Sequence, residues 1–315
     1  MGFKNVTVLG GGVLGSMIAY QAAYCGFNVT VWLRSEGSIG RTQPKLDNIH
    51  KTYIDLINVM DAPEGKNPAI WADGIGNPET FDKDTCLANA DAAYKNVKLE
   101  LDLAEAVKDA DLVIESVAED VQQKLDMYTQ LAPVLPEKTV LVTNSSSFPG
   151  SIFADATGRP EKFLSLHFAN NIWKLNLAEI MAHGKTDMKY FDQIIEFAKE
   201  IKMVLCPVKK EKAGYAANSL LIPFLTAAMD LYVKDIVDPA DADKAWKIGT
   251  GAAYGPFEFL DIIGMETPYN IFCGFAAHPE MVEPYDFQAI ADAFKKKIDE
   301  GKLGLAAGEG FYKYN

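Results

Sequence analysis

The sequence is poor in the residues that build metal centres and disulfide frameworks. Its 315 residues include only 4 cysteines and 4 histidines. The cysteines lie far apart and show no spacing typical of a metal site. We therefore expect no bound metal and four reduced thiols, as in a cytoplasmic protein. The cysteines are Cys25, Cys86, Cys206 and Cys273.

Long apolar runs and a leader segment are also lacking. The best apolar stretch, residues 220–229, contains Pro223 and is too short to cross a bilayer. The chain enters a predicted strand within a few residues of its start, which leaves no room for a signal peptide. These absences predict a soluble protein of the cytoplasm.

Positive charge is scarce relative to negative charge. The formal net charge is −13 and the sequence pI is near 4.8. Such a balance argues against nucleic acid or an anionic membrane surface as a partner. A small-molecule ligand is expected instead, and an anionic one needs a local basic pocket.

The feature that stands out is a glycine-rich turn between a strand and a helix. A β-branched run from Val6 leads into the pattern G-x-G-x-x-G, and a second strand is predicted at residues 28–33. This β-α-β arrangement is typical of dinucleotide binding, because the turn and the helix N-terminus receive the pyrophosphate. The residues expected to bind the cofactor here are Gly10, Gly12, Val13, Leu14 and Gly15.

The end of the second strand indicates which dinucleotide is preferred. An acid usually stands there to bind the adenosine ribose of NAD, but this chain has Leu33, Arg34 and Ser35, with Glu36 one step later. A guanidinium and a hydroxyl would bind a 2′-phosphate that a carboxylate would repel. We therefore predict NADP(H) over NAD(H); alternatively, Arg34 stacks on the adenine.

Strands alternate with helices through the first part of the chain, and helices dominate the rest. The pattern predicts a doubly wound, mostly parallel α/β sheet of the Rossmann type, followed by an all-helical domain. We place the dinucleotide-binding domain at residues 1–186, with a last helix and strand extending to about 208. Residues 209–315 are then the helical substrate and dimerisation domain. The segment 61–80 is predicted to be a loop, either a cover for the substrate or an idle insertion.

Three predicted strands end in polar residues, where doubly wound sheets bind their ligands. The strand ending near Val117 is followed by Glu119, and the one ending at Thr143 is followed by Asn144 and a run of serines. His167 lies at the end of the third strand, and Glu179 lies on the next one. A tight return would bring this carboxylate beside the imidazole, as a base for hydride transfer requires.

Six sequence segments resemble the L-3-hydroxyacyl-CoA dehydrogenase family, and the likeness covers nearly the whole chain. The residues at 166–170 and 213–218 are most similar to the diketoreductase branch of this family. The segments are Thr143-Asn-Ser-Ser-Ser147, Leu166-His-Phe-Ala-Asn170, Leu177-Ala-Glu179, Ala213-Gly-Tyr-Ala-Ala-Asn218, Gly255-Pro-Phe-Glu-Phe-Leu-Asp261 and Gly308-Glu-Gly-Phe-Tyr312.

The resemblance assigns roles to individual residues. It implies that His167 is the general base paired with Glu179, that Ser146 hydrogen-bonds the substrate oxygen and that Asn218 positions it. Ser146 could instead cap the next helix, and Asn218 could tie two helices together. The resemblance also implies that Asn170 touches the nicotinamide or the substrate and that Glu119 and Lys124 lie near the cofactor, and we expect Asn144 to bind the cofactor too. Glu119 could also be an acid at a helix start, and Lys124 a surface lysine.

The chain also departs from the family pattern. Asn171, Ile172 and Trp173 replace residues that usually include proline, while Asn176 and Ser219 stand where Lys and Arg are usual. These changes remove positive charge along the expected acyl-CoA route. Trp173 could further narrow the site.

The sequence predicts an NAD(P)-dependent enzyme that interconverts a 3-hydroxyacyl-CoA, such as 3-hydroxybutyryl-CoA, and its 3-oxo compound by hydride transfer. One alternative is an NADPH-preferring reductase of non-CoA 3-oxo or diketo acids and esters, like a diketoreductase or an L-gulonate dehydrogenase. Another is a non-catalytic structural protein that binds the cofactor. The resemblance implies a homodimer formed through the helical domain.

Overall fold

The computed structural model describes residues 2–67, 70–277 and 285–314. The chain divides into two compact units, residues 1–216 and residues 217–315. Each unit has its own hydrophobic core. Among the described residues, no helix combines the length and the apolar character needed to cross a membrane.

An eight-stranded sheet in the order β3-β2-β1-β4-β5-β6-β7-β8 forms the centre of the first unit. All neighbours pair in parallel except β6 and β7, which are antiparallel. The predicted doubly wound, mostly parallel sheet is confirmed. The strands are β1 (Asn5–Leu9), β2 (Asn28–Trp32), β3 (Lys98–Glu100), β4 (Leu112–Glu115), β5 (Val140–Thr143), β6 (Phe163–Phe168), β7 (Leu177–Met181) and β8 (Val204–Val208).

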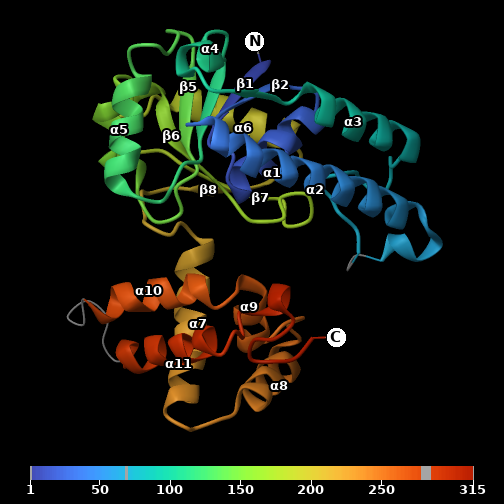
Figure 1. Ribbon diagram of the computed structural model, residues 1–315, viewed down its shortest axis with the longest axis vertical. Helices are drawn as coiled ribbons and strands as arrows, with labels where there is room; N and C mark the ends of the chain where they lie inside the picture. The colour runs from blue at the N-terminus through green and yellow to red at the C-terminus, as the bar shows by residue number, and fades with distance from the viewer. Residues whose placement is uncertain (1, 68–69, 278–284, 315) are drawn as a thin grey trace. The chain divides into compact units, whose positions relative to one another are not determined.

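Helices cover both faces of this sheet (Figure 1). One core lies between the sheet and helices α1, α2, α3 and α6, and the other lies under α4 and α5. Strand side chains alternate between the two, so that Val8 joins the first core and the adjacent Leu9 joins the second. The helices are α1 (Val13–Tyr24), α2 (Glu36–Asp61), α3 (Lys83–Asn96), α4 (Leu103–Val107), α5 (Val121–Leu131) and α6 (Met188–Glu200).

The antiparallel return between β6 and β7 has a direct consequence for function. Its register places His167 opposite Glu179 and Phe168 opposite Ala178. Side chains opposite one another on paired strands lie on the same face and within contact distance. The antiparallel return expected from the sequence is therefore present, although it runs through residues 169–176 rather than a tight turn, and it sets the two polar side chains side by side.

Two helices of the first unit differ from the sequence-based expectation. α2 begins at Glu36, ahead of the periodic stretch 46–60, and it continues through Pro44. Proline lacks the N–H that an interior helical position donates, so it favours a helix boundary that tertiary packing has overridden here. α3 was not predicted, because its buried face consists of the small side chains Cys86, Ala90 and Ala93, which give a weak hydrophobic period.

The loop expected at 61–80 is anchored where the structure describes it. The buried amide of Gln21 donates to the carbonyl of Gly74, and Tyr24 donates to that of Ile75. The N–H of Gly74 donates to the carbonyl of Trp173, whose ring packs against Tyr53 in the core. Trp173 is thus a core residue that fixes this segment, and its narrowing of a substrate pocket stays a prediction.

The second unit is helical, as predicted. Buried carboxylates tie its C-terminal segment to its helices: Asp261 accepts from the N–H groups of Phe311 and Tyr312, and Asp243 accepts from the Tyr312 hydroxyl. The helix at 266–276 was not expected from the sequence. The helices are α7 (Ala217–Val233), α8 (Pro239–Thr250), α9 (Pro256–Ile263), α10 (Glu266–Ala276) and α11 (Phe287–Asp299).

Candidate active site

The glycine turn joins β1 to α1 in the conformation that dinucleotide binding requires. Gly10 has a φ of 108°, and a Cβ there would stand 2.6 Å from the carbonyl oxygen of Ser116. A Cβ on Gly15 would stand 2.2 Å from the carbonyl oxygen of Gly10, so only glycine permits this approach of helix and turn. Gly12 caps α1 without any side-chain hydrogen bond, and no atom lies within 4 Å of where its Cβ would be.

This open position leaves the first-turn N–H groups of α1 uncovered by a capping side chain. Such groups, with the positive end of the helix dipole, bind phosphate. Val13 and Leu14 are the first two residues of the helix, and Val13 is exposed. The chain therefore fits the pyrophosphate of a dinucleotide at this turn.

The end of β2 presents hydroxyl and guanidinium groups beside the turn. Leu33 is buried, while Arg34 and Ser35 are exposed. The Ser35 hydroxyl lies 3.1 Å from that of Ser38, and Arg41 donates to Ser38 Oγ at 2.9 Å. Sequence reasoning did not identify Arg41, which approaches Ser38 because one turn of α2 separates them.

The serine run after β5 is held by the acid that follows β4. Glu119 Oε1 accepts from the Ser145 hydroxyl at 2.7 Å and from the Ser147 N–H at 2.8 Å. Burial alone would raise the pKa of Glu119, but the hydrogen bond from Ser145 and the charge of Lys124 outweigh burial and lower that pKa. Glu119 thus stays ionised and fixes the residues on both sides of Ser146.

Ser146, His167 and Glu179 form one hydrogen-bonded chain. Glu179 Oε2 lies 3.0 Å from His167 Nδ1, and His167 Nε2 lies 3.1 Å from Ser146 Oγ. Because the carboxylate can only accept, His167 Nδ1 donates to it, and Nε2 is left as an acceptor for the serine hydroxyl. Glu179 is 1% exposed, and its second oxygen accepts from the Ala216 N–H at 2.9 Å.

Lys124 is enclosed by protein, which bears on its expected role at the cofactor. Its ammonium lies 2.6 Å from Glu115 Oε1 and 3.3 Å from Glu119 Oε2, and the side chain is 1% exposed. Glu115 also accepts from the hydroxyls of Tyr128 and Thr143. This geometry favours an indirect role of Lys124 through Glu119, and its assignment as a cofactor ligand stays a prediction.

The remaining predicted site residues lie in different surroundings. The Asn144 side chain accepts from the Phe168 N–H at 3.0 Å and so links the ends of β5 and β6. Asn170 is exposed just after β6. Asn218 is the second residue of α7, in the helical unit.

Two further residues of the site region were missed by sequence reasoning. Tyr215 stacks on His167 with ring centroids 4.7 Å apart and ring planes 14° apart. Glu115 is hidden at the end of an apolar strand. A carboxylate in a buried strand requires a partner, and Lys124 and Tyr128, four residues apart on the next helix, were the available signal.

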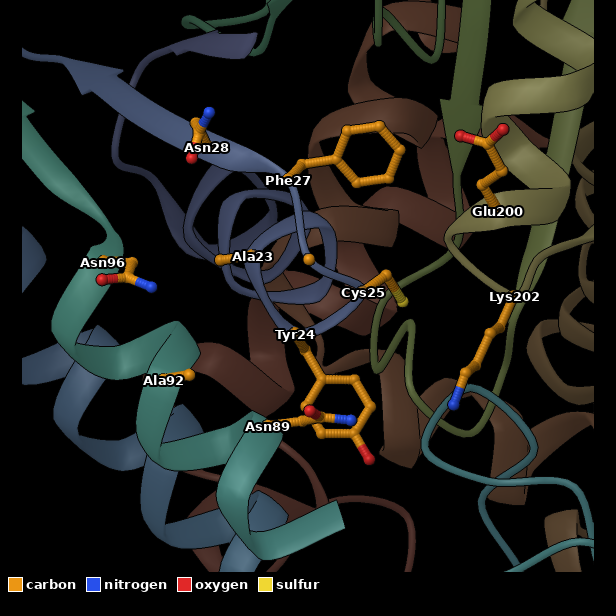
Figure 2. Close-up of a pocket in the computed structure, with 11 residues that line it drawn as sticks. Ala23, Tyr24, Cys25, Phe27, Asn28, Asn89, Ala92, Asn96, Glu200 and Lys202 are labelled. Carbon is orange, nitrogen blue, oxygen red and sulfur yellow. The ribbon is translucent and has the colours of Figure 1, made fainter. Parts of the chain in front are cut away.

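A separate cavity of about 320 Å³ borders the end of α1, helix α3 and the end of α6 (Figure 2). Its lining includes Tyr24, Cys25 and Lys202, whose ammonium lies 5.2 Å from the centre of the Tyr24 ring. Burial raises the pKa of the Cys25 thiol to about 11, so this thiol is a poor nucleophile. His167 and Glu179 do not line this cavity.

A dinucleotide-binding α/β unit that presents a histidine–carboxylate pair at a strand end defines an oxidoreductase of CH–OH groups. Residues 75–211 match the NAD-binding domain of 3-hydroxyacyl-CoA dehydrogenase, and residues 214–314 match the C-terminal domain of that enzyme. The chain belongs to the 3-hydroxyacyl-CoA dehydrogenase family, as its sequence resemblance indicated.

Individual relatives cover nearly the whole chain. The mitochondrial hydroxyacyl-coenzyme A dehydrogenase of Mus musculus is 30% identical over 99% of this chain and 91% of its own length. A 3-hydroxybutyryl-CoA dehydrogenase of Clostridioides difficile is 28% identical and covers 99% of both chains. A solved diketoreductase, described as a dual catalyst of dicarbonyl compounds, is 42% identical over 100% of both chains, with a TM-score of 0.84.

Proposed function

We propose that this enzyme interconverts a 3-hydroxyacyl compound and its 3-oxo form, with a 3-hydroxyacyl-CoA such as 3-hydroxybutyryl-CoA as the substrate class. The observation that carries the proposal is the hydrogen-bonded chain from Glu179 through His167 to Ser146 at the end of β6. The named activities of the mouse and C. difficile relatives support the same substrate class.

In the oxidation direction His167 Nε2 takes the proton of the substrate hydroxyl. Glu179 holds the Nδ1–H at 3.0 Å and stabilises the imidazolium that forms. The Ser146 hydroxyl, already directed at Nε2, keeps the substrate oxygen within reach of the base. In the reverse direction the imidazolium returns the proton to the forming alkoxide. Asn218, carried by the helical unit, is proposed to orient the same oxygen.

When bound, a nicotinamide dinucleotide supplies the hydride acceptor or donor for this reaction. The uncapped start of α1 and the open position at Gly12 fit its pyrophosphate. We propose NADP(H) as the preferred form, because Leu33 replaces the usual acid while Arg34, Ser35 and Arg41 supply groups that bind a 2′-phosphate. Asn144, Asn170, Glu119 and Lys124 are proposed to line the nicotinamide end directly or through their neighbours.

The second candidate is a reductase of non-CoA 3-oxo or diketo acids and esters. It is favoured by the 42% identity to the diketoreductase over the full length of both chains. Asn176 and Ser219, which replace the usual basic residues, also weaken the case for a CoA phosphate route. A structural protein without catalysis is disfavoured, because Ser146, His167 and Glu179 lie in hydrogen-bonding contact.

One spectrophotometric screen tests both candidates. NADPH and NADH oxidation are followed with acetoacetyl-CoA, an acetoacetate ester and a diketo ester as substrates. The main proposal predicts the highest kcat/KM for acetoacetyl-CoA, and the second candidate predicts it for the ester or the diketo ester. No turnover with any of the three would contradict both. A lower KM for NADH than for NADPH would contradict the proposed cofactor preference.

We also propose that the enzyme is a homodimer formed through its helical unit. Large apolar side chains of that unit are exposed, among them Leu220, Trp246 and Ile248, as expected of an interaction surface. Sedimentation equilibrium tests this, and a monomer at micromolar concentration would contradict it.

The four cysteines are all free thiols, which supports work in a reducing compartment such as the cytoplasm.

A further inference from the structure

The two residues that follow Ala213 adopt a backbone conformation that side chains rarely favour. Gly214 has a φ of 78°, and Tyr215 has a φ of 50°. A positive φ is unusual for a bulky residue and persists only where surrounding contacts hold it. The Tyr215 side chain is 1% exposed, so its strained backbone is matched by an enclosed ring.

This short segment contacts two members of the proposed catalytic chain, His167 and Glu179, and the residue next to the third. The Tyr215 ring stacks on His167 at a centroid distance of 4.7 Å. Its hydroxyl donates to the carbonyl of Ser145, next to Ser146, at 2.9 Å. The N–H of Ala216 donates to Glu179 Oε1 at 2.9 Å. Two successive residues, Tyr215 and Ala216, therefore contact the histidine, the carboxylate and the backbone just before Ser146.

The stacked geometry acts on charge as well as on position. The face of an aromatic ring is electron-rich and attracts a cation lying over it. His167 becomes a cation when it takes the substrate proton, and the nearly parallel Tyr215 ring lies against it at that moment. Burial also raises the pKa of Tyr215, so its hydroxyl stays protonated and keeps donating to Ser145.

We infer that Tyr215 is a positioning residue of the catalytic chain: its ring stabilises the imidazolium form of His167, and its hydroxyl fixes the turn that carries Ser146. This inference rests on the proposed function, in which His167 is the base. In this role Tyr215 acts through His167 and Ser145.

Other charged groups near this pair are accounted for by their partners. Glu179 is opposite His167 on β7 and binds both His167 and Ala216. Glu119 and Glu115 lie close enough to influence Tyr215, and Lys124 bridges these two carboxylates. The substitutions below leave all of these groups in place, so a change in pH dependence reports on the ring.

The experiment compares Tyr215→Phe, Tyr215→Leu and Tyr215→Met in the full-length enzyme. Phe keeps the stacked ring and removes only the hydroxyl, while Leu and Met remove the ring and fill its space. Tyr53→Phe and Tyr53→Leu are the matched controls, because Tyr53 is equally buried but its hydroxyl binds Gln21 rather than the site. The measurements are kcat, KM, cofactor affinity and the pH profile of alcohol oxidation.

Removing the ring destabilises the imidazolium, so the base stays neutral to a lower pH. For Tyr215→Leu and Tyr215→Met we expect the acid limb of the oxidation profile to move about half a unit to one unit lower. We also expect kcat to fall roughly tenfold. For Tyr215→Phe, which keeps the ring, we expect the acid limb of the profile to stay at its wild-type position while kcat falls about threefold to tenfold. Cofactor affinity stays within about twofold in all of them.

His167→Gln, measured in parallel, separates the inference from the proposed function. If His167→Gln retains activity, the assignment of the base is wrong. If it loses activity while the Leu and Met variants keep the wild-type acid limb, only the inference about Tyr215 is overturned. A limb that moves equally in the Tyr53 variants also overturns it. Should Tyr215→Leu not fold, the limb of Tyr215→Met decides.

Discussion

Glu115 and Lys124 form an ion pair that is enclosed by protein, with 2.6 Å between Glu115 Oε1 and the Lys124 ammonium. Their side chains are 0% and 1% exposed. Hydroxyls of Tyr128 and Thr143 bind the second carboxylate oxygen, so both charges have their partners inside the protein. The Lys124 ammonium also lies 3.3 Å from Glu119 Oε2. Glu119 in turn accepts hydrogen bonds from Ser145 and Ser147.

Breaking this pair is expected to cost far more stability than breaking an exposed one. Lys124→Met leaves the Glu115 carboxylate buried without its cation, which costs about 3–5 kcal/mol. Lys138→Met is the control, because Lys138 lies at the same 2.6 Å from Asp111 but is 54% exposed. It is expected to cost about 1 kcal/mol or less. Urea unfolding measures both, and equal losses would contradict the role given to the buried pair.

Two glycines of the turn are expected to respond differently to alanine. Gly12→Ala meets no protein atom within 4 Å, so stability should change by about 1 kcal/mol or less. Its methyl group occupies the phosphate's approach, however, and the dissociation constant of the dinucleotide should rise about tenfold or more. Calorimetric titration measures this. Unchanged affinity in Gly12→Ala would show that the pyrophosphate binds elsewhere.

Gly15→Ala is the opposite case. Its Cβ would stand 2.2 Å from the carbonyl oxygen of Gly10, and backbone must move to admit it. We expect a loss of roughly 1–3 kcal/mol in the free energy of unfolding even without cofactor. A Gly15→Ala protein as stable as wild type would mean that the turn and α1 do not pack as closely as the structure shows.

The guanidinium of Arg34 is expected to select between the two dinucleotides. Arg34→Gln removes a charge-assisted contact to the 2′-phosphate, so the KM for NADPH should rise about tenfold or more while that for NADH changes little. Lys51→Gln on α2 removes the same charge from an exposed position and should alter neither. Equal effects of Arg34→Gln on both cofactors would indicate stacking on adenine instead.

Much of the dinucleotide-binding unit is predictable because its signals are local. A β-branched run, three spaced glycines and a second strand define β1, α1 and β2 without any long-range information. α3 escapes prediction because its buried face is made of alanines and a cysteine. α2 passes through Pro44 because packing of residues such as Leu46 and Tyr53 outweighs the lost hydrogen bond.

The candidate site also combines residues that local sequence signals predict with residues that only the folded structure reveals. His167 and Glu179 could be paired from the sequence because an antiparallel return between adjacent strands sets side chains opposite each other. Tyr215 could not be singled out, since its stacking depends on two consecutive residues with positive φ, for which Gly214 is only a partial signal. Glu115 is concealed within an apolar strand, and only the three-dimensional arrangement reveals its partners.

The most direct test of the account is the turnover of His167→Gln and Glu179→Gln with the best substrate from the screen. His50→Gln, which alters a histidine that binds Tyr20 and lies outside the site, is the control. The account predicts that both site variants lose roughly 10²–10⁴-fold in kcat while their affinity for the dinucleotide stays close to wild type. Turnover near the wild-type value in both variants would contradict it.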